Sequence, residues 1–231
     1  MKTIGVLGGQ CPQATLDLAT RVHAATQRRI PQAAPGDYPS LVIYYYRPPP
    51  AERAGAGPRR PAPRPDPRLV QAVTQLGALA DFLVIAAPAP HQFQAALEHA
   101  AGRPILGLID LVLDAVQERH WTRVGVLGRD PALYRQGLAR RGKAVVSLAD
   151  HWPDLRDRLD LAIGALTTGP PDAPSRAVAE EAVAVLRAQR VDGIILSCPE
   201  MPLLLGDAAN AADLLNPAEL LADAAVCRAM A

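Results

Sequence analysis

Gly193-Ile194-Ile195-Leu196-Ser197-Cys198-Pro199-Glu200 has the pattern of a buried strand that stops at a cysteine. Its branched aliphatic side chains predict the strand, and Pro199 cannot donate to a strand ladder beyond it. Cys198 is therefore expected at the carboxyl end of the strand, where open α/β sheets bind their ligands. A free cysteine is often only a small buried hydrophobe, so a functional interpretation needs a second observation.

That second observation is an earlier copy of the same pattern, Asp81-Phe82-Leu83-Val84-Ile85-Ala86-Ala87-Pro88-Ala89. Aligned with residues 192–200, both segments open on aspartate, continue with an aliphatic core and carry a proline at the same place. In this alignment the residue opposite Cys198 is Ala87. A site built around a pseudo-twofold axis would thus have a thiol on one side of its ligand and a methyl group on the other.

Each copy also follows its own Gly-Val-Leu-Gly segment, at 5–8 and at 125–128. Such self-similarity predicts an α/β fold of two pseudo-symmetric lobes, each a parallel-type sheet flanked by helices, with a cleft between them. We expect lobe one to contain residues 1–112 and 207–231, and lobe two to contain residues 113–206.

Apolar periodicity predicts the remaining elements. The expected strands are 3–7, 41–46, 81–88, 104–109, 123–128, 145–148 and the 193–200 stretch. The expected helices are 15–27, 68–80, 92–100, one that ends at 117, 155–166, 177–189 and 217–230. Residues 47–68 are rich in Pro, Arg, Gly and Ala, which is typical of a solvated, semi-rigid loop.

Composition narrows the classes of function. The 231 residues are 49% hydrophobic and 20% charged with a net charge of +1, which predicts neither a nucleic-acid partner nor an anionic membrane partner. No apolar run approaches the roughly 18–20 residues of a membrane span, and residues 1–9 lack the layout of a signal peptide. Cysteines at 11, 198 and 227 fit neither a disulfide framework nor a metal site, so we expect reduced thiols in the cytoplasm.

Two further positions at predicted strand ends could meet a ligand. The loop Gly8-Gly9-Gln10-Cys11-Pro12 joins a strand to a helix, and the helix N-terminus could hold an anion there, although Gly-Gly is also an ordinary tight turn. Arg47 ends the 41–46 strand, where its guanidinium could fork onto a substrate carboxylate.

With these motifs the chain resembles the aspartate/glutamate racemase superfamily, whose members work without pyridoxal phosphate. The resemblance covers Ile4 to Thr15, Asp81 to Phe93 with His91, Gly193 to Leu205, and Asn216 to Ala222. It implies an isomerase of amino acids or other small carboxylates that uses no cofactor. Dimers are common in that superfamily, so the resemblance also implies a homodimer.

In that superfamily two cysteines flank the substrate α-carbon, one removing a proton and the other delivering one to the opposite face. Thiols suit this role because modest electrostatic help makes the thiolate available near neutral pH. The resemblance makes Cys198 one catalytic acid/base and places Ala87 where the second cysteine belongs. By the same resemblance, the substrate-binding positions are Gln10, Cys11, Arg47, Ala87, Pro88, Ala89, Pro199 and Glu200.

Several of these positions depart from the superfamily pattern. Ala87-Pro88-Ala89-Pro90-His91 stands where Cys-Asn-Thr-Ala-His is usual, and Pro199 replaces a threonine after Cys198. Thr168 stands in the place of a lysine, and Cys11 in the place of the glycine after Gln10. Amide and hydroxyl groups that hold a carboxylate are thereby lost, so the pocket is expected to accept a different substrate.

Three interpretations stay open on this evidence. The protein could keep two-base chemistry with Cys11 as the second thiol, or use one cysteine to protonate a planar enediolate, as malonate-decarboxylating relatives do. It could also be a non-catalytic carboxylate-binding relative. Outside the site, we expect His91 to cap or position a helix, and Cys227 to pack within the terminal helix. The other histidines, 23, 99, 120 and 151, are expected at the surface or in packing contacts.

Overall fold

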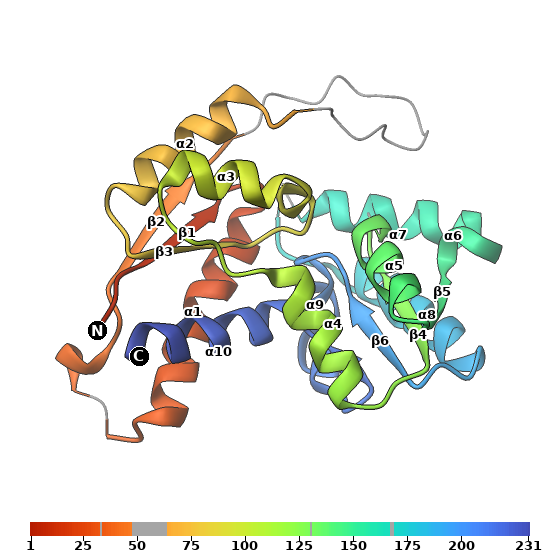
Figure 1. Ribbon diagram of the computed structural model, residues 1–231. Helices are drawn as coiled ribbons and strands as arrows, with labels where there is room; N and C mark the ends of the chain where they lie inside the picture. The colour runs from red at the N-terminus through yellow and green to blue at the C-terminus, as the bar shows by residue number, and fades with distance from the viewer. Residues whose placement is uncertain (33, 48–63, 130, 167–168) are drawn as a thin grey trace.

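The computed structural model describes residues 1–32, 34–47, 64–129, 131–166 and 169–231, and it contains two parallel sheets (Figure 1). The first sheet has the strand order β2-β1-β3, from β1 (Ile4–Gly8), β2 (Leu41–Tyr45) and β3 (Phe82–Ile85). The second has the order β5-β4-β6-β7, from β4 (Arg123–Leu127), β5 (Ala144–Ser147), β6 (Gly193–Leu196) and β7 (Leu214–Leu215). The predicted α/β fold with two sheets is confirmed.

Helices connect the strands and flank both sheets. The first-sheet half carries α1 (Pro12–Arg29), α2 (Pro67–Gly77), α3 (Gln94–Ala101), α4 (Leu108–Glu118) and the short turns η1 (Pro35–Asp37) and η2 (Ala89–Phe93). The rest of the chain carries α5 (Ala132–Arg140), α6 (Leu148–His151), α7 (Pro153–Ala165), α8 (Ala173–Ala188), α9 (Met201–Leu205), η3 (Gly206–Asn210) and α10 (Pro217–Met230). In Figure 1, α2 and α3 cover one side of the first sheet, while α1 and α10 lie on its other side.

Strand register repeats between the two sheets, as the internal repeat predicts. In the first sheet Ile4 pairs with Phe82, and in the second Val124 pairs with Gly193. These are the partners that the Gly-Val-Leu-Gly alignment requires, since residue 4 aligns with 124 and residue 82 with 193. The two sheets are therefore built to one pattern.

The two aspartates that open the repeated segments explain how the copies keep this register. Asp81 Oδ2 accepts a hydrogen bond from Thr3 N at 2.7 Å, and Asp81 N donates back to Thr3 O at 3.0 Å. Asp192 Oδ2 likewise accepts from Arg123 N at 2.9 Å, and Asp192 N donates to Arg123 O at 2.8 Å. Each carboxylate thus fixes the start of one strand to the start of its neighbour.

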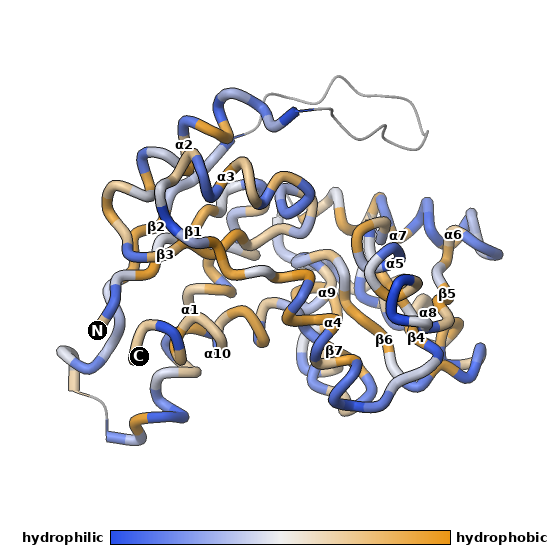
Figure 2. The backbone as a smooth tube through the Cα atoms, viewed as in Figure 1, coloured by the Kyte–Doolittle hydropathy of each residue, from blue (hydrophilic) through white to orange (hydrophobic). Residues whose placement is uncertain are grey.

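Alternate residues of the strands fill different parts of the core. Ile4, Val6 and Val84 of the first sheet and Val124, Val126 and Ile195 of the second belong to one central cluster with α1, α4, α5 and α10. Leu83 and Ile85 instead face α2 and α3 in a second cluster. Ile194 and Leu196 face α7, α8 and α9 in a third. The apolar strands and helix faces appear in orange in Figure 2.

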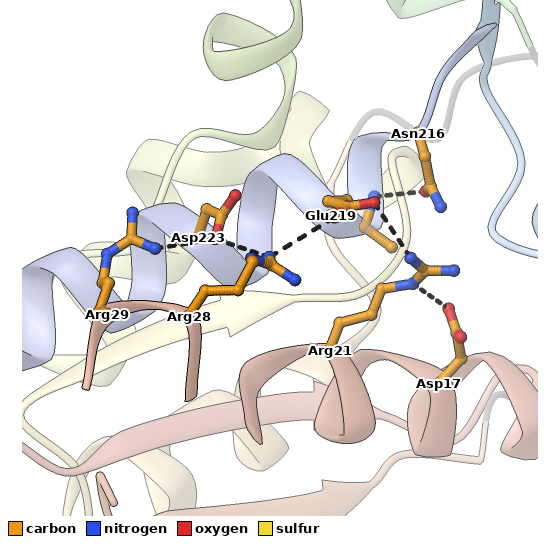
Figure 3. Close-up of polar contacts among 8 residues, drawn as sticks. Asp17, Arg21, Arg28, Arg29, Asn216, Glu219 and Asp223 are labelled. Carbon is orange, nitrogen blue, oxygen red and sulfur yellow. Dashed lines mark hydrogen bonds and ion pairs between the residues drawn. The ribbon is translucent and has the colours of Figure 1, made fainter. Parts of the chain in front are cut away.

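Helices α1 and α10, which lie far apart in the sequence, are held together by charged side chains (Figure 3). Arg28 and Arg29 each approach Asp223 Oδ1 at 3.0 Å, and Arg21 Nη1 lies 3.3 Å from Glu219 Oε2. These side chains are partly exposed to solvent, so we assign each pair only about 0–1 kcal/mol.

Several predicted elements differ from the structure. The strands predicted over 81–88 and 193–200 end at Ile85 and Leu196, and the helix predicted over 177–189 begins at Ala173. Residues 104–109 do not form a strand, because only Ile105 bridges to Leu83 before α4 begins at Leu108. The predicted helix from residue 92 begins instead at Gln94, preceded by η2.

The predicted lobe boundaries stay a prediction. In the structure, the last segment contacts both halves of the molecule, because β7 pairs with β6 while α10 packs on α1. Among the residues that the structure describes, none of the helices has the length and apolar character required to cross a membrane.

Candidate active site

A cleft of about 970 Å³ lies at the carboxyl ends of the parallel strands, between the two sheets. Its walls come from the loops that follow β1, β3, β4 and β6, from Tyr46 after β2, and from α6 and α7. Eight of the nine predicted site residues line it, namely Gln10, Cys11, Ala87, Pro88, Ala89, Cys198, Pro199 and Glu200. This is the edge of a parallel sheet where ligands bind in open α/β folds.

A rigid turn places Cys11 on the first-sheet side of the cleft. Gly9 has a φ of 95°, a left-handed conformation that side chains rarely adopt. Thr15 closes the turn, because its hydroxyl accepts from Gly9 N at 2.9 Å and donates to Cys11 O at 3.0 Å. Cys11 is consequently the N-cap residue of α1, with Pro12 in the first turn.

Opposing influences act on the Cys11 thiol, which is only 4% exposed. Burial raises its pKa, and the Glu200 carboxylate raises it further. Backbone N–H groups of Ala14 and Gln13, in the first turn of α1, lower it. The net effect is a raised pKa, so the resting group is a neutral thiol. Its Sγ lies 3.6 Å from Gln13 Oε1.

Cys198 sits on the second-sheet side, pressed against a glycine. A Cβ on Gly128, whose φ is 148°, would lie 2.7 Å from Cys198 Cβ and 2.6 Å from Ser197 Oγ. Ser197 anchors the segment, because its N–H and its hydroxyl both donate to Leu127 O, at 2.8 and 3.0 Å. The absence of a side chain at 128 therefore lets Cys198 pass directly over the end of β4.

The Cys198 thiol donates a hydrogen bond to the Glu200 carboxylate. Burial raises the pKa of Cys198 well above its ordinary value, and the neighbouring Glu200 carboxylate adds to the increase. Backbone N–H groups of Glu200 and Arg129 act in the opposite direction, because they favour the thiolate. The site thus combines a protonated thiol, an adjacent carboxylate that can accept its proton, and backbone N–H groups that stabilise the thiolate once it forms.

Tyr134 of α5 is a polar group buried behind Cys198. Its side chain is 0% exposed, and its hydroxyl has no hydrogen-bond partner among the described residues. Burial raises the pKa of this phenol, and the charge of Cys198 raises it further. The hydroxyl therefore stays protonated.

The first-sheet counterpart of Cys198 has little chemistry of its own. Ala87, Pro88 and Ala89 line the cleft with methyl and ring carbons. His91 is buried below them in η2 and is not the N-cap residue of α3, which is Phe93. Its ring nitrogens lie 3.2 Å from Gln94 Oε1 and 3.4 Å from Ile85 O, so His91 positions η2 against β3. Burial lowers its pKa.

Arg47, the ninth predicted site residue, lies at the rim and does not line the cleft. Its Nη1 donates to Gly9 O at 3.1 Å, and its guanidinium lies 5.7 Å from the centre of the Tyr45 ring. Arg47 therefore braces the Gly8–Gly9 turn. Thr168 and the 48–63 part of the Pro-rich loop lie outside the described residues.

Charged side chains that the sequence analysis did not single out form the second-sheet wall. Arg129, Arg156, Asp157 and Asp160 line the cleft. Arg129 Nη2 donates to Asp160 O at 2.8 Å, and Arg156 pairs with Asp157 at 2.7 Å. The repeat could have identified Arg129, because it directly follows Gly128 and aligns with Gly9. The residues on α7 carry no comparable sequence signal.

Cys227 and four of the histidines lie away from the cleft. Cys227 does not pack in the core, because its side chain is exposed and its sulfur lies 3.0 Å from Arg29 Nη2. The histidines at 23, 99, 120 and 151 are exposed. Within the described ranges no group of three or more His, Cys, Asp or Glu side chains is arranged to hold a metal ion.

Comparison with known proteins identifies the family and the fold of the chain. The Asp/Glu/Hydantoin racemase family model matches residues 6–225. The crystal structure of an aspartate racemase homologue from Pyrococcus horikoshii OT3 superposes with a TM-score of 0.71 at 20% identity, covering all of both chains. The aspartate racemase of Picrophilus torridus gives a TM-score of 0.72 at 18% identity, covering 100% of this chain and 95% of that one. At these identities the likeness to solved structures concerns the fold.

Proposed function

The chain belongs to the Asp/Glu/hydantoin racemase family, and we propose that it is an isomerase-type enzyme that moves a proton at the α-carbon of a small carboxylate or amino acid. Cys198 is the proposed acid/base. Gln10, Cys11, Ala87, Pro88, Ala89, Pro199 and Glu200 are the proposed substrate-binding residues, with Arg47 at the rim.

The observation that carries the proposal is the hydrogen bond from the Cys198 thiol to the Glu200 carboxylate. When that proton passes to Glu200, the sulfur becomes a thiolate, which backbone N–H groups of Arg129 and Glu200 favour. The thiolate can then take the α-proton of the substrate, leaving a planar enediolate, and return a proton to the same carbon. A positioned acid/base of this kind contributes roughly 10²–10⁴-fold to a rate.

The walls of the cleft support a particular kind of substrate. Arg129 lines the second-sheet wall of the cleft, and guanidinium groups bind carboxylates in two-point geometry. Ala87, Pro88 and Ala89 on the other side present only carbon to the substrate. A carboxylate with an apolar substituent on its α-carbon can pair with the guanidinium on one wall and pack against the carbon atoms of the other. Phenylglycine is a simple probe of that class.

Proton exchange at the α-carbon tests this proposal. Incubated in D₂O, the protein should replace the α-hydrogen of L-phenylglycine by deuterium, as followed by proton NMR. Cys198→Ala should slow the exchange about 100-fold or more, whereas Cys227→Ala should leave it unchanged because Cys227 lies outside the cleft. Equal rates in the wild type and Cys198→Ala would contradict the proposal.

A second candidate is decarboxylation of a substituted malonate, and one specific observation favours it. Cys198 is protonated at rest, and position 87 across the repeat holds a methyl group. After loss of CO₂ from one carboxylate, the remaining enediolate needs one proton on one face, which a single thiol supplies. Phenylmalonate in D₂O should then release CO₂ and give phenylacetate with one deuterium of defined configuration.

The proposed enzyme works without a cofactor and as a dimer. The chemistry above uses the chain's own thiol and carboxylate and calls for no cofactor. We further propose a cytoplasmic homodimer whose lobes are residues 1–112 with 207–231 and residues 113–206.

A further inference from the structure

Inversion at a carbon requires proton carriers on two faces, because a single base returns the proton to the face from which it came. Cys198 supplies one carrier on the second-sheet side of the cleft. The equivalent position of the first sheet, Ala87, has no proton to exchange. Whether the site can invert a substrate therefore depends on what else the first-sheet wall contains.

Among the described residues of that wall, the titratable side chains are Cys11 and Tyr46. Tyr46 is a poor candidate, because burial raises the pKa of its phenol and the neighbouring Asp66 raises it further. Its hydroxyl is also engaged with the Asp66 carboxylate. Cys11 remains, with an ordinary pKa that already lies closer to neutrality than that of tyrosine.

The geometry around Cys11 suits a proton carrier. The Gly9–Thr15 hydrogen bond and the N-cap position on the 18-residue helix α1 fix the sulfur at the cleft. Helix N-termini favour a thiolate through their unpaired N–H groups and dipole. Ala14 and Gln13 of the first turn have this effect on Cys11.

Glu200 connects the two thiols. Its carboxylate accepts the hydrogen bond of Cys198 and also acts on Cys11 through charge and a side-chain hydrogen bond. One carboxylate thus acts on two thiols of the same cleft, one that follows β1 and one that follows β6.

We infer that Cys11 is the second proton carrier of this site and that Glu200 passes protons between Cys11 and Cys198. This inference rests on the proposed function. In one turnover, Glu200 takes the Cys198 proton, and the Cys198 thiolate then removes the α-proton to give an enediolate. Cys11 delivers its proton to the opposite face, and Glu200 returns its proton to the Cys11 thiolate. Both thiols and the carboxylate end in their starting states, and the reverse reaction uses the same groups in the opposite order.

The test separates exchange from inversion. Enantiopure L-phenylglycine in D₂O is followed by proton NMR for deuterium uptake and by chiral chromatography for configuration. The wild type should form α-deuterated D-phenylglycine from the first turnovers. Cys11→Ala should keep deuterium uptake through Cys198 and Glu200 but lose inversion at least tenfold, with retained L-configuration. Cys227→Ala is the matched control and should behave as the wild type.

Each contrary outcome identifies which idea fails. If Cys11→Ala inverts the substrate at the wild-type rate, the role of Cys11 is overturned. The role is also overturned if the wild-type protein takes up deuterium without inverting the substrate. No deuterium uptake by the wild type overturns the proposed function and this inference with it. Because Cys11 is buried, Cys11→Ser is measured in parallel, and the unfolding midpoint of each variant shows that it is folded. Loss of uptake in a folded Cys11→Ser variant would also contradict the inference, which requires only inversion to fail.

Discussion

Ala87 and Cys198 occupy the same register position in the two sheets. Leu7 pairs with Ile85 and Leu127 pairs with Leu196, so each of the two residues lies two positions beyond the last paired residue of its strand. The residue that precedes each of them makes the same backbone hydrogen bond. Ala86 N donates to Leu7 O at 3.2 Å, and Ser197 N donates to Leu127 O at 2.8 Å. The cleft is therefore built symmetrically, while its chemistry is not.

This equivalence predicts a gain of function. Introducing Ala87→Cys into the Cys11→Ala variant should place a thiol opposite Cys198 and raise the rate of L-phenylglycine inversion at least tenfold over Cys11→Ala alone. Chiral chromatography of the product measures the change. Ala89→Cys in the same background serves as the control, because position 89 lies two residues farther along and should not restore inversion. Equal rates in the two double variants would contradict the equivalence.

Gly128→Ala should damage both the fold and the site. The added Cβ would lie 2.6–2.9 Å from Ser197 Oγ, Cys198 Cβ and Cys198 N, and crowding of this kind costs roughly 1–3 kcal/mol of unfolding free energy. Denaturant unfolding measures this cost, and deuterium uptake should fall together with it. Gly36→Ala is the control, since nothing lies within 4 Å of a Cβ there. Unchanged stability and uptake in Gly128→Ala would rule out the close approach of Cys198.

Much of the fold could be predicted from the sequence. Gly-Val-Leu-Gly at 5–8 and 125–128 marks the central strands, and the aligned aspartates 81 and 192 make the same backbone contacts in both sheets. The aliphatic runs at 82–85 and 193–196 also predict buried strands, and both faces of these strands are indeed covered, since Leu83 and Val84 contact different core clusters. The 104–109 segment was predicted wrongly because its apolar run is shared between a single bridge and the start of α4.

The candidate site was only partly predictable. Positions next to the repeated strands, such as Cys198 and Ala87, follow from the alignment alone. The hydrogen bond between Cys198 and Glu200 depends on side-chain rotamers and on the room left by Gly128. Asp160 reaches the cleft from the long helix α7, whose sequence carries no mark of a site. Contacts between elements distant in sequence require the packed structure.

Tyr134→Phe should stabilise the protein. The Tyr134 hydroxyl is buried and has no partner among the described residues, and an unsatisfied buried polar group costs about 1–3 kcal/mol. Removing it should raise the free energy of unfolding by about 1 kcal/mol in denaturant titrations. Tyr45→Phe, at a partly exposed position, should change it by less than about 0.5 kcal/mol. Destabilisation by Tyr134→Phe would mean that the hydroxyl does have a partner.

His91 should make stability depend on pH. Burial lowers its pKa in the folded protein, while Gln94, Ile85, Asp110 and Glu98 oppose that effect less strongly. Because the unfolded chain then binds more protons, stability is lost as the pH falls below about 6.5, with a slope of up to about 1.4 kcal/mol per pH unit from this group. His91→Gln should have a flatter stability curve between pH 7 and 5. An unchanged slope would show that His91 does not titrate on unfolding.

The coupling of Cys198 to Glu200 is tested most directly by measuring the alkylation of Cys198 against pH. Iodoacetamide labelling, read at each cysteine by mass spectrometry, reports the thiolate. Burial and the Glu200 carboxylate raise the pKa of Cys198, whereas the backbone N–H groups of Glu200 and Arg129 lower it. We expect a wild-type midpoint above the ordinary cysteine value of about 8.5, and a lower midpoint in Glu200→Gln, with Cys227 unchanged in both. The same Cys198 midpoint with and without the Glu200 carboxylate would contradict this coupling.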